Sequence, residues 1–515
     1  MKIKYPLGIQ TFSKIINREL LYIDKTAIIY DLIDQGSAYF LSRPRRFGKS
    51  LLVSTLESLF SGHKALFEGL YIADTDYDFA EYPVISLEFS RVDVRQGDDL
   101  AQYIINTTNR YARNWEISLE IEAYEQRFEE LLIKLYEKTG QEIVLLVDEY
   151  DKPILDNLFN DKIDGIKQVM NRFYATLKSM DRYLRFTFIT GVSKFAKISV
   201  FSGMNHLSDI SMNADYATLC GITQEELESH FGLAVDELAK KEQLDRLQIL
   251  AKIKHWYNGY RFHHSAISVY NPFSLLSLLQ RKEFNNYWFT TATPTFLLDL
   301  LQNKQYELKN LSDVNVGIAA FDASNPHDMD IQSLFVQTGY LTIKSYTAPR
   351  YQLGFPNYEV KKSFFDSVAA RYAQISPGAG QNYTYELTEA IQTDNLDTFF
   401  KILKIFFANI PYDITLQHEK YYQSLFYALF KLIGLTIEAE VRTNEGRIDC
   451  VVQNDNTIYI IEFKLNGTKE QALQQINDKN YALKYQGSDK KIVLLGVEFD
   501  KDSRNIGEYI VIDCL

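Results

Sequence analysis

Short apolar runs alternate with helical patterns over residues 20–200. Four of these runs have the length of strands and are apolar enough to be covered on both faces, as in a parallel sheet. They are AYFLS (38–42), VISLEF (84–89), IVLLV (143–147) and RFTFIT (185–190). The segments between them predict helices near 50–60, 98–113, 120–138 and 163–179. This alternation predicts an α/β domain built on a mostly parallel sheet.

From about residue 223 the pattern becomes mostly helical. TQEELESHF opens with a capping box, in which Thr223 is followed three residues on by Glu226. Further helices are predicted near 244–256, 272–281 and 294–302. Residues 333–372 read as helix, strand, strand, helix, an order that suits a winged-helix-like element. ISPGAGQNY (375–383) has the Pro and Gly content of a linker.

The C-terminal part follows another order, in which one helix precedes a run of strands. The pattern predicts a helix at 419–433, strands near 435–442, 447–453 and 457–464, a helix at 468–485 and a strand at 490–497. A chain of 515 residues is long enough for about three domains, and this change of order marks the last of them.

Charge and cysteine content narrow the class of protein. A net charge of −12 argues against nonspecific coating of nucleic acid over the whole surface, although it leaves room for a local basic groove. Three widely spaced cysteines encode neither a disulfide framework nor a cysteine zinc site. No run of about 18 apolar residues occurs, and the first residues lack a signal-peptide core. We expect a soluble, cytoplasmic protein that does not enter a membrane.

The stretch SRPRRFGKSLL (42–52) ends like a phosphate-binding loop. Lysine in such a loop reaches the β- and γ-phosphates of a nucleotide, and the next hydroxyl ligates Mg²⁺. The usual first glycine is replaced here by Arg43, while Gly48, the position of closest backbone approach, is kept. We expect the following residues to bind the nucleotide: Arg45, Arg46, Phe47, Gly48, Lys49, Ser50 and Leu51. Arg45 and Arg46 either neutralise phosphate charge or form a solvent-facing rim.

Two later strands end in residues that suit such a site. EIVLLVDEYDKP (142–153) is an apolar strand followed by Asp148, expected to hold Mg²⁺ together with Ser50, and by Glu149, expected to act as the catalytic base toward water. RFTFITGVSK ends in Thr190 and Ser193, where a polar residue can sense the γ-phosphate.

A second set of charged residues lies near the C-terminus. In GRIDCVVQNDNTIYIIEFKLNG (446–467), Glu462 and Lys464 face the same side of a strand, and a hairpin brings Asp449 beside them. Two carboxylates placed in this way can bind Mg²⁺, while lysine positions or deprotonates a water molecule. Gln475, on the following helix, completes the expected catalytic set, and Glu419 is expected as a further metal ligand.

Together, SRPRRFGKSLL, LLVDEYDKP, FITGVSKF and WYNGYRF (256–262) resemble the bacterial AAA-ATPase-like family, and so does LGFPNYEVKKSF (353–364). The resemblance covers nearly the whole chain. It implies a P-loop NTPase domain over 1–222, a helical lid or middle region over 223–380, and a restriction-endonuclease-like domain of the PD-(D/E)XK superfamily over 381–515. WYNGYRF is expected to pack the lid on the ATPase core.

Two functions remain open. In the first, binding of ATP and Mg²⁺ gates Mg²⁺-dependent cleavage of nucleic acid, more readily DNA than RNA. In the second, a nucleotide-switch scaffold binds nucleic acid or protein without cutting it.

Arg182 and Arg185 are either strand-edge charges or arginine fingers that act across the interface of a homo-oligomer. His263 and His264 are expected at the surface.

Overall fold

A computed structural model describes residues 4–158, 160–194, 207–288, 295–304, 306, 308, 311, 314–321, 331–410, 419–434, 438–444, 447–464, 467–500, 503 and 505–514. These residues form two compact units, and each unit has its own sheet. Unit 1 consists of Met1–Ala292 and Val314–Glu359, and unit 2 of Thr293–Asp313 and Val360–Leu515. The bounds of the three domains expected from the sequence stay predictions.

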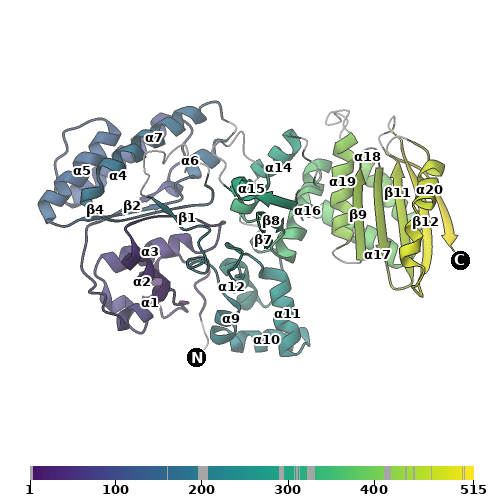
Figure 1. The fold of residues 1–515 in the computed structure, drawn as a ribbon, viewed down its shortest axis with the longest axis horizontal. Coiled ribbons are helices and arrows are strands. Elements are labelled where there is room, and N and C mark those ends of the chain that lie inside the picture. The colour runs from purple at the N-terminus through teal and green to yellow at the C-terminus, as the bar shows by residue number, and fades with distance from the viewer. Residues whose placement is uncertain are drawn as a thin grey trace. The chain divides into compact units, whose positions relative to one another are not determined.

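Unit 1 is built around a five-stranded parallel sheet (Figure 1). Its strands are β1 (Ala38–Ser42), β2 (Val84–Glu88), β3 (Ile143–Asp148), β4 (Leu184–Gly191) and β5 (Ser208–Asp209), in the order β2-β3-β4-β1-β5. Every residue of β1 and β3 is buried, because helices cover both faces of the sheet. All neighbouring strands are parallel, so their carboxyl ends lie along one edge. The predicted α/β class and its four strands are confirmed.

The helices of the sheet domain fall on its two sides. They are α1 (Phe12–Asn17), α2 (Thr26–Gln35), α3 (Lys49–Phe60), α4 (Gly97–Asn114), α5 (Tyr124–Thr139), α6 (Lys152–Leu155) and α7 (Ile163–Ser179). In Figure 1, α4, α5 and α7 lie above the sheet and α1, α2 and α3 below it. Helix α3 follows β1 directly, and this junction forms the phosphate-loop segment.

A helical region follows in unit 1 and has its own apolar core. Its helices are α9 (Gln224–His230), α10 (Gly232–Glu242), α11 (Arg246–Tyr257) and α12 (Pro272–Arg281). The predicted capping box at the start of α9 is confirmed. The Glu226 N–H donates to Thr223 Oγ1 at 3.1 Å, and the Thr223 N–H donates to Glu226 Oε2 at 2.8 Å.

The predicted order helix, strand, strand, helix is also confirmed. The elements are α15 (Ile331–Thr338), β7 (Thr342–Thr347), β8 (Arg350–Gly354) and α16 (Tyr358–Ala373). A further strand, β6 (Val314–Gly317), pairs with β8, and the antiparallel sheet has the order β6-β8-β7. This order, with a helix before the hairpin, is the arrangement that the winged-helix-like prediction calls for.

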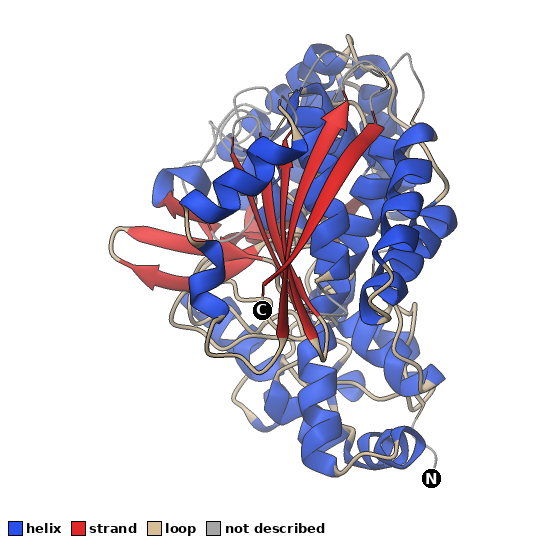
Figure 2. Ribbon diagram, turned by 90° about the vertical axis from the view of Figure 1, so that its right-hand side faces the viewer, coloured by secondary structure: helices blue, strands red, loops and turns tan. Residues whose placement is uncertain are grey.

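Unit 2 has a mixed five-stranded sheet in the order β13-β12-β11-β10-β9. Its elements include α14 (Thr295–Asn303), α17 (Pro377–Gln392), α18 (Leu396–Ala408), α19 (Glu419–Ile433), β9 (Glu438–Asn444), β10 (Arg447–Gln453), β11 (Thr457–Lys464), α20 (Lys469–Asp478), β12 (Lys491–Asp500) and β13 (Asn505–Cys514). Figure 2 shows its strands with helices on both sides. Ile458 and Ile460 of β11 pack toward α20, whereas Phe463 packs on Phe426 and Phe430 of α19.

The predicted linker at 375–383 is wrong. Ser376 caps the first turn of α17, where its hydroxyl accepts from the Ala379 N–H, and Pro377 occupies the first helical position. Proline is favoured there because that position needs no N–H donor.

No helix of the described residues is long and apolar enough to cross a membrane.

Candidate functional site

The phosphate-loop segment joins the buried strand β1 to α3 at the carboxyl edge of the parallel sheet. Gly48 precedes α3 and has a φ of +92°, a backbone conformation that favours glycine. A Cβ atom at Gly48 would meet nothing within 4 Å, so the backbone there borders open space. The first N–H groups of α3 therefore lie next to backbone that no side chain covers. Exposed N–H groups at a helix N-terminus are the geometry that binds an anion.

Arg43 occupies the position where such a loop usually begins with glycine. Its side chain is buried, and the guanidinium donates to the carbonyl oxygens of Ser42, Ser211 and Tyr216 at 2.8–3.1 Å. The same guanidinium lies 4.0 Å from the ring centre of Phe262, in the WYNGYRF motif. Burial lowers the pKa of Arg43 to about 10. Arg43 thus anchors the start of the loop to neighbouring segments.

Lys49 is the first residue of α3 and is also buried. Its Nζ donates to the carbonyl oxygens of Arg43 and Pro44 at 2.9 and 3.0 Å, within its own loop. Burial lowers the pKa of Lys49, and the carboxylates of Asp148 and Glu149 oppose that shift. The ammonium group is therefore held at the centre of the loop, beside two acidic side chains.

The acidic pair lies at the end of β3. Burial raises the pKa of Asp148, and the nearby Ser50 hydroxyl opposes that shift, so the two predicted Mg²⁺ ligands are neighbours. Burial also raises the pKa of Glu149, against the effect of Lys49. Glu149 has a φ of +52°, which is uncommon for a residue with a side chain and typical of constrained functional positions.

Thr190 and Ser193 behave differently at the end of β4. Thr190 is fully buried, and its hydroxyl has no hydrogen-bond partner among the described residues. The Ser193 hydroxyl instead donates to Asp151 Oδ2 at 2.7 Å, and Asp151 also accepts from the N–H groups of Val192 and Ser193. Asp151 was not predicted; its only sequence signal is a place in the acidic segment DEYD.

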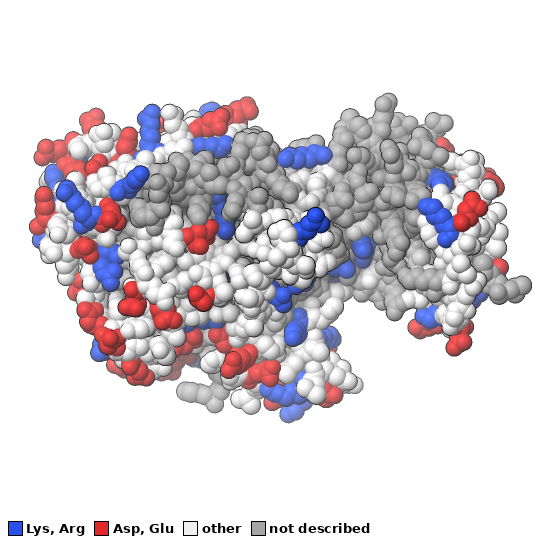
Figure 3. All heavy atoms as spheres, in the orientation of Figure 1, with Lys and Arg blue, Asp and Glu red and all other residues white. Residues whose placement is uncertain are grey.

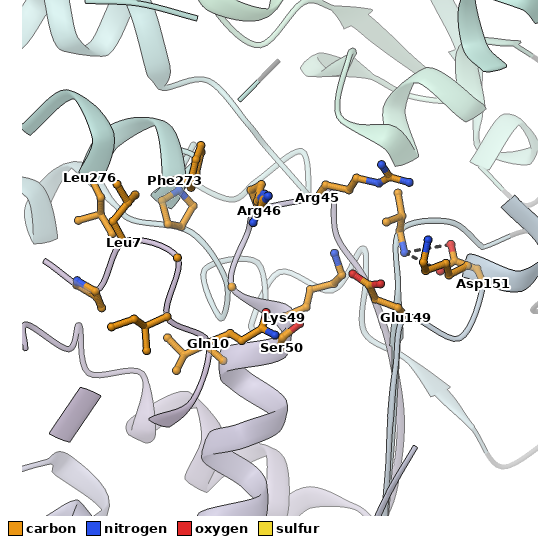
Figure 4. Close-up of a pocket in the computed structure, with 18 of the residues that line it drawn as sticks. Leu7, Gln10, Arg45, Arg46, Lys49, Ser50, Glu149, Asp151, Phe273 and Leu276 are labelled. Carbon is orange, nitrogen blue, oxygen red and sulfur yellow. Dashed lines mark hydrogen bonds between the residues drawn. The ribbon is translucent and has the colours of Figure 1, made fainter. Parts of the chain in front are cut away.

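A cavity of about 400 Å³ lies over the loop (Figure 4). Among the predicted nucleotide-binding residues, those that line it are Arg45, Arg46, Gly48, Lys49, Ser50 and Leu51, and Glu149 joins them. Lining residues that were not predicted include Pro6–Gln10 and three residues of α12, namely Pro272, Phe273 and Leu276. The Arg46 guanidinium lies 5.0 Å from the ring centre of Phe273, and the Arg46 side chain is exposed.

Phe47 lies away from this cavity. Its buried ring contacts Tyr260 and Phe262 edge-on, with centroid distances of 4.8 and 5.4 Å. The WYNGYRF motif therefore packs on the loop itself, as its predicted packing role requires.

The Arg45 carbonyl is held from outside the loop. Trp288 Nε1 donates to it at 3.1 Å, and Asn271 Nδ2 at 3.5 Å. The backbone N–H of Trp288 donates to Glu359 Oε1 at 2.7 Å. Glu359 is almost fully buried, and burial raises its pKa to about 7. Gly339 packs against the loop as well, since a Cβ there would meet the Pro44 ring at 2.6 Å.

Arg182 and Arg185 lie at the opposite end of β4 from the loop. The Arg182 guanidinium stacks on the ring of Tyr183, 4.6 Å from its centre. Because parallel strands end at one edge, residues at the start of β4 do not reach the site of their own chain. A role across a subunit interface stays a prediction.

The second set of predicted residues lies in the sheet of unit 2. The antiparallel register pairs Asp449 of β10 directly with Glu462 of β11. Directly opposed residues share a face of the sheet, and Lys464, two residues on, shares it too. The Lys464 Nζ lies 3.7 Å from Glu462 Oε1 and donates a hydrogen bond to Gln475 Oε1 of α20. The structure thus brings Glu462, Lys464 and Gln475 together at one face of the sheet. The strand register places Asp449 opposite Glu462.

Helix α20 covers this face closely. Gly496 of β12 pairs with Glu462, and a Cβ at Gly496 would meet the Lys469 carbonyl at 2.3 Å and the Leu473 N–H nitrogen at 2.9 Å. Glycine is therefore required for α20 to approach the sheet here. Glu462 is buried beneath this helix, with 0% of the residue exposed.

The donor set suits a hard divalent cation. Glu462 has carboxylate oxygens, the ligands that Mg²⁺ prefers, and the strand register places a second acidic residue, Asp449, opposite it. The Gln475 amide nitrogen is buried without a hydrogen-bond partner in the part of the chain described. A buried donor of this kind usually has a partner, so its hydrogen bonding is incomplete here. The predicted ligand Glu419 begins α19, and its side chain, like that of Asp449, lies outside the described residues. The described side chains contain no complete cluster of three or more metal-ligating residues.

Comparisons with known proteins agree with this division. Residues 6–201 match the family model described as "Predicted AAA-ATPase", and residues 417–509 match the PD-(D/E)XK nuclease superfamily. A relative from Azotobacter chroococcum mcd 1, described as an uncharacterized protein in the vnfD 5′ region, is 39% identical over 522 residues, covering 99% of this chain and 98% of its own. The chain therefore belongs to the AAA-ATPase-like family, with a C-terminal domain of the PD-(D/E)XK nuclease superfamily.

Proposed function

We propose that unit 1 binds and hydrolyses ATP. The backbone around Gly48 and the Lys49 ammonium would hold the phosphates, and Thr190 would donate its unpaired hydroxyl toward the γ-phosphate. Ser50 and Asp148 would ligate Mg²⁺, which neutralises phosphate charge when bound. Glu149, which lines the cavity, would accept a proton from the attacking water. The cavity over the loop, which Gly48, Lys49, Ser50 and Glu149 line together, supports this assignment most directly.

We propose further that unit 2 cleaves phosphodiester bonds in nucleic acid, with DNA as the first substrate to test. Asp449 and Glu462 would hold Mg²⁺, which polarises the phosphodiester and lowers the pKa of bound water. Lys464 would orient that water or the scissile phosphate, with Gln475 keeping the ammonium in place. The register that pairs Asp449 with Glu462 is the observation that carries the proposal. ATP binding in unit 1 would gate this cleavage.

A switch scaffold that binds nucleic acid without cleavage is the second candidate. The observation in its favour is the complete burial of Glu462 beneath α20, together with the hydrogen bond that holds Lys464 on Gln475. A Glu462 carboxylate covered in this way must be uncovered before a phosphodiester can reach it. A scaffold would never need that opening.

The deciding experiment is a Mg²⁺-dependent cleavage assay on single- and double-stranded DNA and RNA, with and without ATP. Asp449→Asn should lose cleavage by a factor of about 100 or more, because Mg²⁺ would lose a charged ligand. The matched control is Asp455→Asn, in the exposed turn after β10, which should cut like the wild type. Equal cleavage by Asp449→Asn would end the nuclease proposal. Binding without cleavage by the wild type would favour the scaffold.

A further inference from the structure

The β7–β8 hairpin of unit 1 projects from the sheet β6-β8-β7 and carries a surface that neither proposed site uses (Figure 2, the hairpin at the left). Every residue from Lys344 to Arg350 is exposed. The segment after Gly259 lies alongside, since the Arg261 N–H donates to Thr342 Oγ1 at 2.8 Å. We call the following residues the hairpin surface: Arg261, His263, His264, Lys344, Tyr346 and Arg350.

The hairpin surface is cationic in an acidic protein. Residues 331–358 contain Lys344 and Arg350 and no Asp or Glu, whereas the whole chain has a net charge of −12. Arg350 forms no ion pair with any described residue. Figure 3 shows Lys, Arg and uncharged residues where Figure 1 places β7 and β8, while carboxylates gather over elements farther from the hairpin. Burial and the neighbouring His264 lower the pKa of His263, and the Asp215 carboxylate opposes that shift.

Aromatic rings follow one another across the same surface. Ring centroids are 4.1 Å apart between His263 and His264, 4.3 Å between His264 and Tyr346, and 4.6 Å between Tyr346 and Tyr351. The Tyr346 side chain is 38% exposed and so offers ring surface to solvent. Cations beside a supported, exposed ring are the combination that holds an unstacked base and its phosphates.

The surroundings of the hairpin hold this surface in place. A Cβ at Gly259, whose φ is +111°, would meet the Pro356 carbonyl at 2.1 Å, so only glycine allows the two segments to pack. The Arg261 guanidinium donates to the Lys344 carbonyl at 3.0 Å, and Lys344 Nζ donates to the Pro356 carbonyl at 3.0 Å. The preceding helix α15 is largely buried and has no free face to enter a groove. The hairpin is therefore the part of this element that can meet a partner.

We propose that the hairpin surface binds single-stranded nucleic acid, with a base stacked on Tyr346 and backbone phosphates beside Arg350 and Arg261. This inference rests on the proposed action on nucleic acid and adds the place where the strand is held in unit 1. A single strand fits better than a duplex, because a ring can stack only on a base that has left its own stack.

The test is fluorescence anisotropy of a labelled single-stranded oligonucleotide with the full-length protein, in EDTA so that no Mg²⁺-dependent cleavage occurs. Tyr346→Ala should weaken binding about tenfold or more, at all salt concentrations. Arg350→Glu should weaken it by a similar factor and reduce the steepness of its salt dependence by about one phosphate contact. The matched controls are Tyr385→Ala, an exposed tyrosine of α17, and Arg18→Glu, an exposed arginine after α1. Circular dichroism establishes that each variant is folded.

Wild-type affinity in both hairpin variants, or an equal loss in the controls, would overturn the inference. So would binding of duplex alone, or no binding by the wild type. The nuclease proposal is tested separately by cleavage. If the hairpin variants bind normally while Asp449→Asn loses cleavage, the inference fails and the nuclease stands. If the hairpin variants lose binding and no substrate is cut, the inference stands and the nuclease fails.

Discussion

The two candidate sites use glycine for opposite purposes. At the candidate nucleotide site, Gly48 borders open space and leaves the backbone bare beside a cavity of about 400 Å³. At the nuclease-like site, Gly496 has no free space, because α20 occupies it and covers Glu462. The first site is open to a ligand, whereas the second is covered by its own fold. Sequence motifs alone do not show this difference.

The comparison also concerns what stabilises each set of charges. In unit 1, Lys49 lies beside Asp148 and Glu149, and every one of these groups has its pKa moved by burial toward the neutral form. A bound nucleotide would bring negative phosphates to Lys49, and its Mg²⁺ would bring positive charge to Asp148 and Glu149. In unit 2, Lys464 bonds to Gln475 and lies near Glu462, so the charges compensate one another locally.

The largest effect is expected from Glu149→Gln, which tests the catalytic half of the open site. The amide keeps the size of the side chain but cannot accept the proton from water. ATP turnover should fall about 10²- to 10⁴-fold, the usual range for a general base. Turnover is measured by phosphate release from the full-length protein. Glu122→Gln, at an exposed position, is the control, and wild-type turnover by Glu149→Gln would show that another group is the base.

Glu359 gives a pH test of the network behind the loop. A carboxyl whose pKa rises from 4.5 to about 7 on folding binds a proton more tightly in the folded state. The contribution of Glu359 to the free energy of unfolding therefore falls as pH rises from 4.5 to 7, by roughly 3 kcal/mol at most. Glu359→Gln should lack this component and so become more stable relative to the wild type at pH 8 than at pH 5. Urea unfolding followed by tryptophan fluorescence measures it, because all three tryptophans lie in unit 1.

An unchanged difference between wild type and Glu359→Gln across this pH range would contradict the buried position of the carboxyl.

The paired glycine variants give the smallest effects and test the contrast itself. Gly496→Ala should destabilise unit 2 by about 2 kcal/mol, because the methyl group overlaps the backbone of α20. Gly48→Ala should cost unit 1 about 1 kcal/mol, through its positive φ alone, yet weaken nucleotide binding. Hydrogen exchange of α20 and tryptophan fluorescence measure the two effects. Equal stability losses with normal nucleotide binding would show that Gly48 does not border a ligand site.

Much of the fold could be predicted because the strands of unit 1 are buried on both faces and appear as short apolar runs. The nuclease-like hairpin could be predicted because its two-residue period and its short turn fix which positions share a face. The hydrogen bonds that hold Arg43 could not be predicted, because the carbonyl groups of Ser211 and Tyr216 that accept them are distant in sequence. The start of α17 was misread because proline and glycine favour helix starts as well as linkers.

The most direct test of two separate sites is Mn²⁺ binding to the full-length protein, followed by electron paramagnetic resonance with and without a nonhydrolysable ATP analogue. Mn²⁺ shares the oxygen ligands and octahedral geometry of Mg²⁺. Without nucleotide, the wild type should bind Mn²⁺ and Asp449→Asn should lose that binding. Adding the analogue should bring additional Mn²⁺, kept in Asp449→Asn and lost in Lys49→Ala, with Lys178→Ala as control. Undiminished Mn²⁺ in Asp449→Asn, or analogue-dependent Mn²⁺ in Lys49→Ala, would contradict the account.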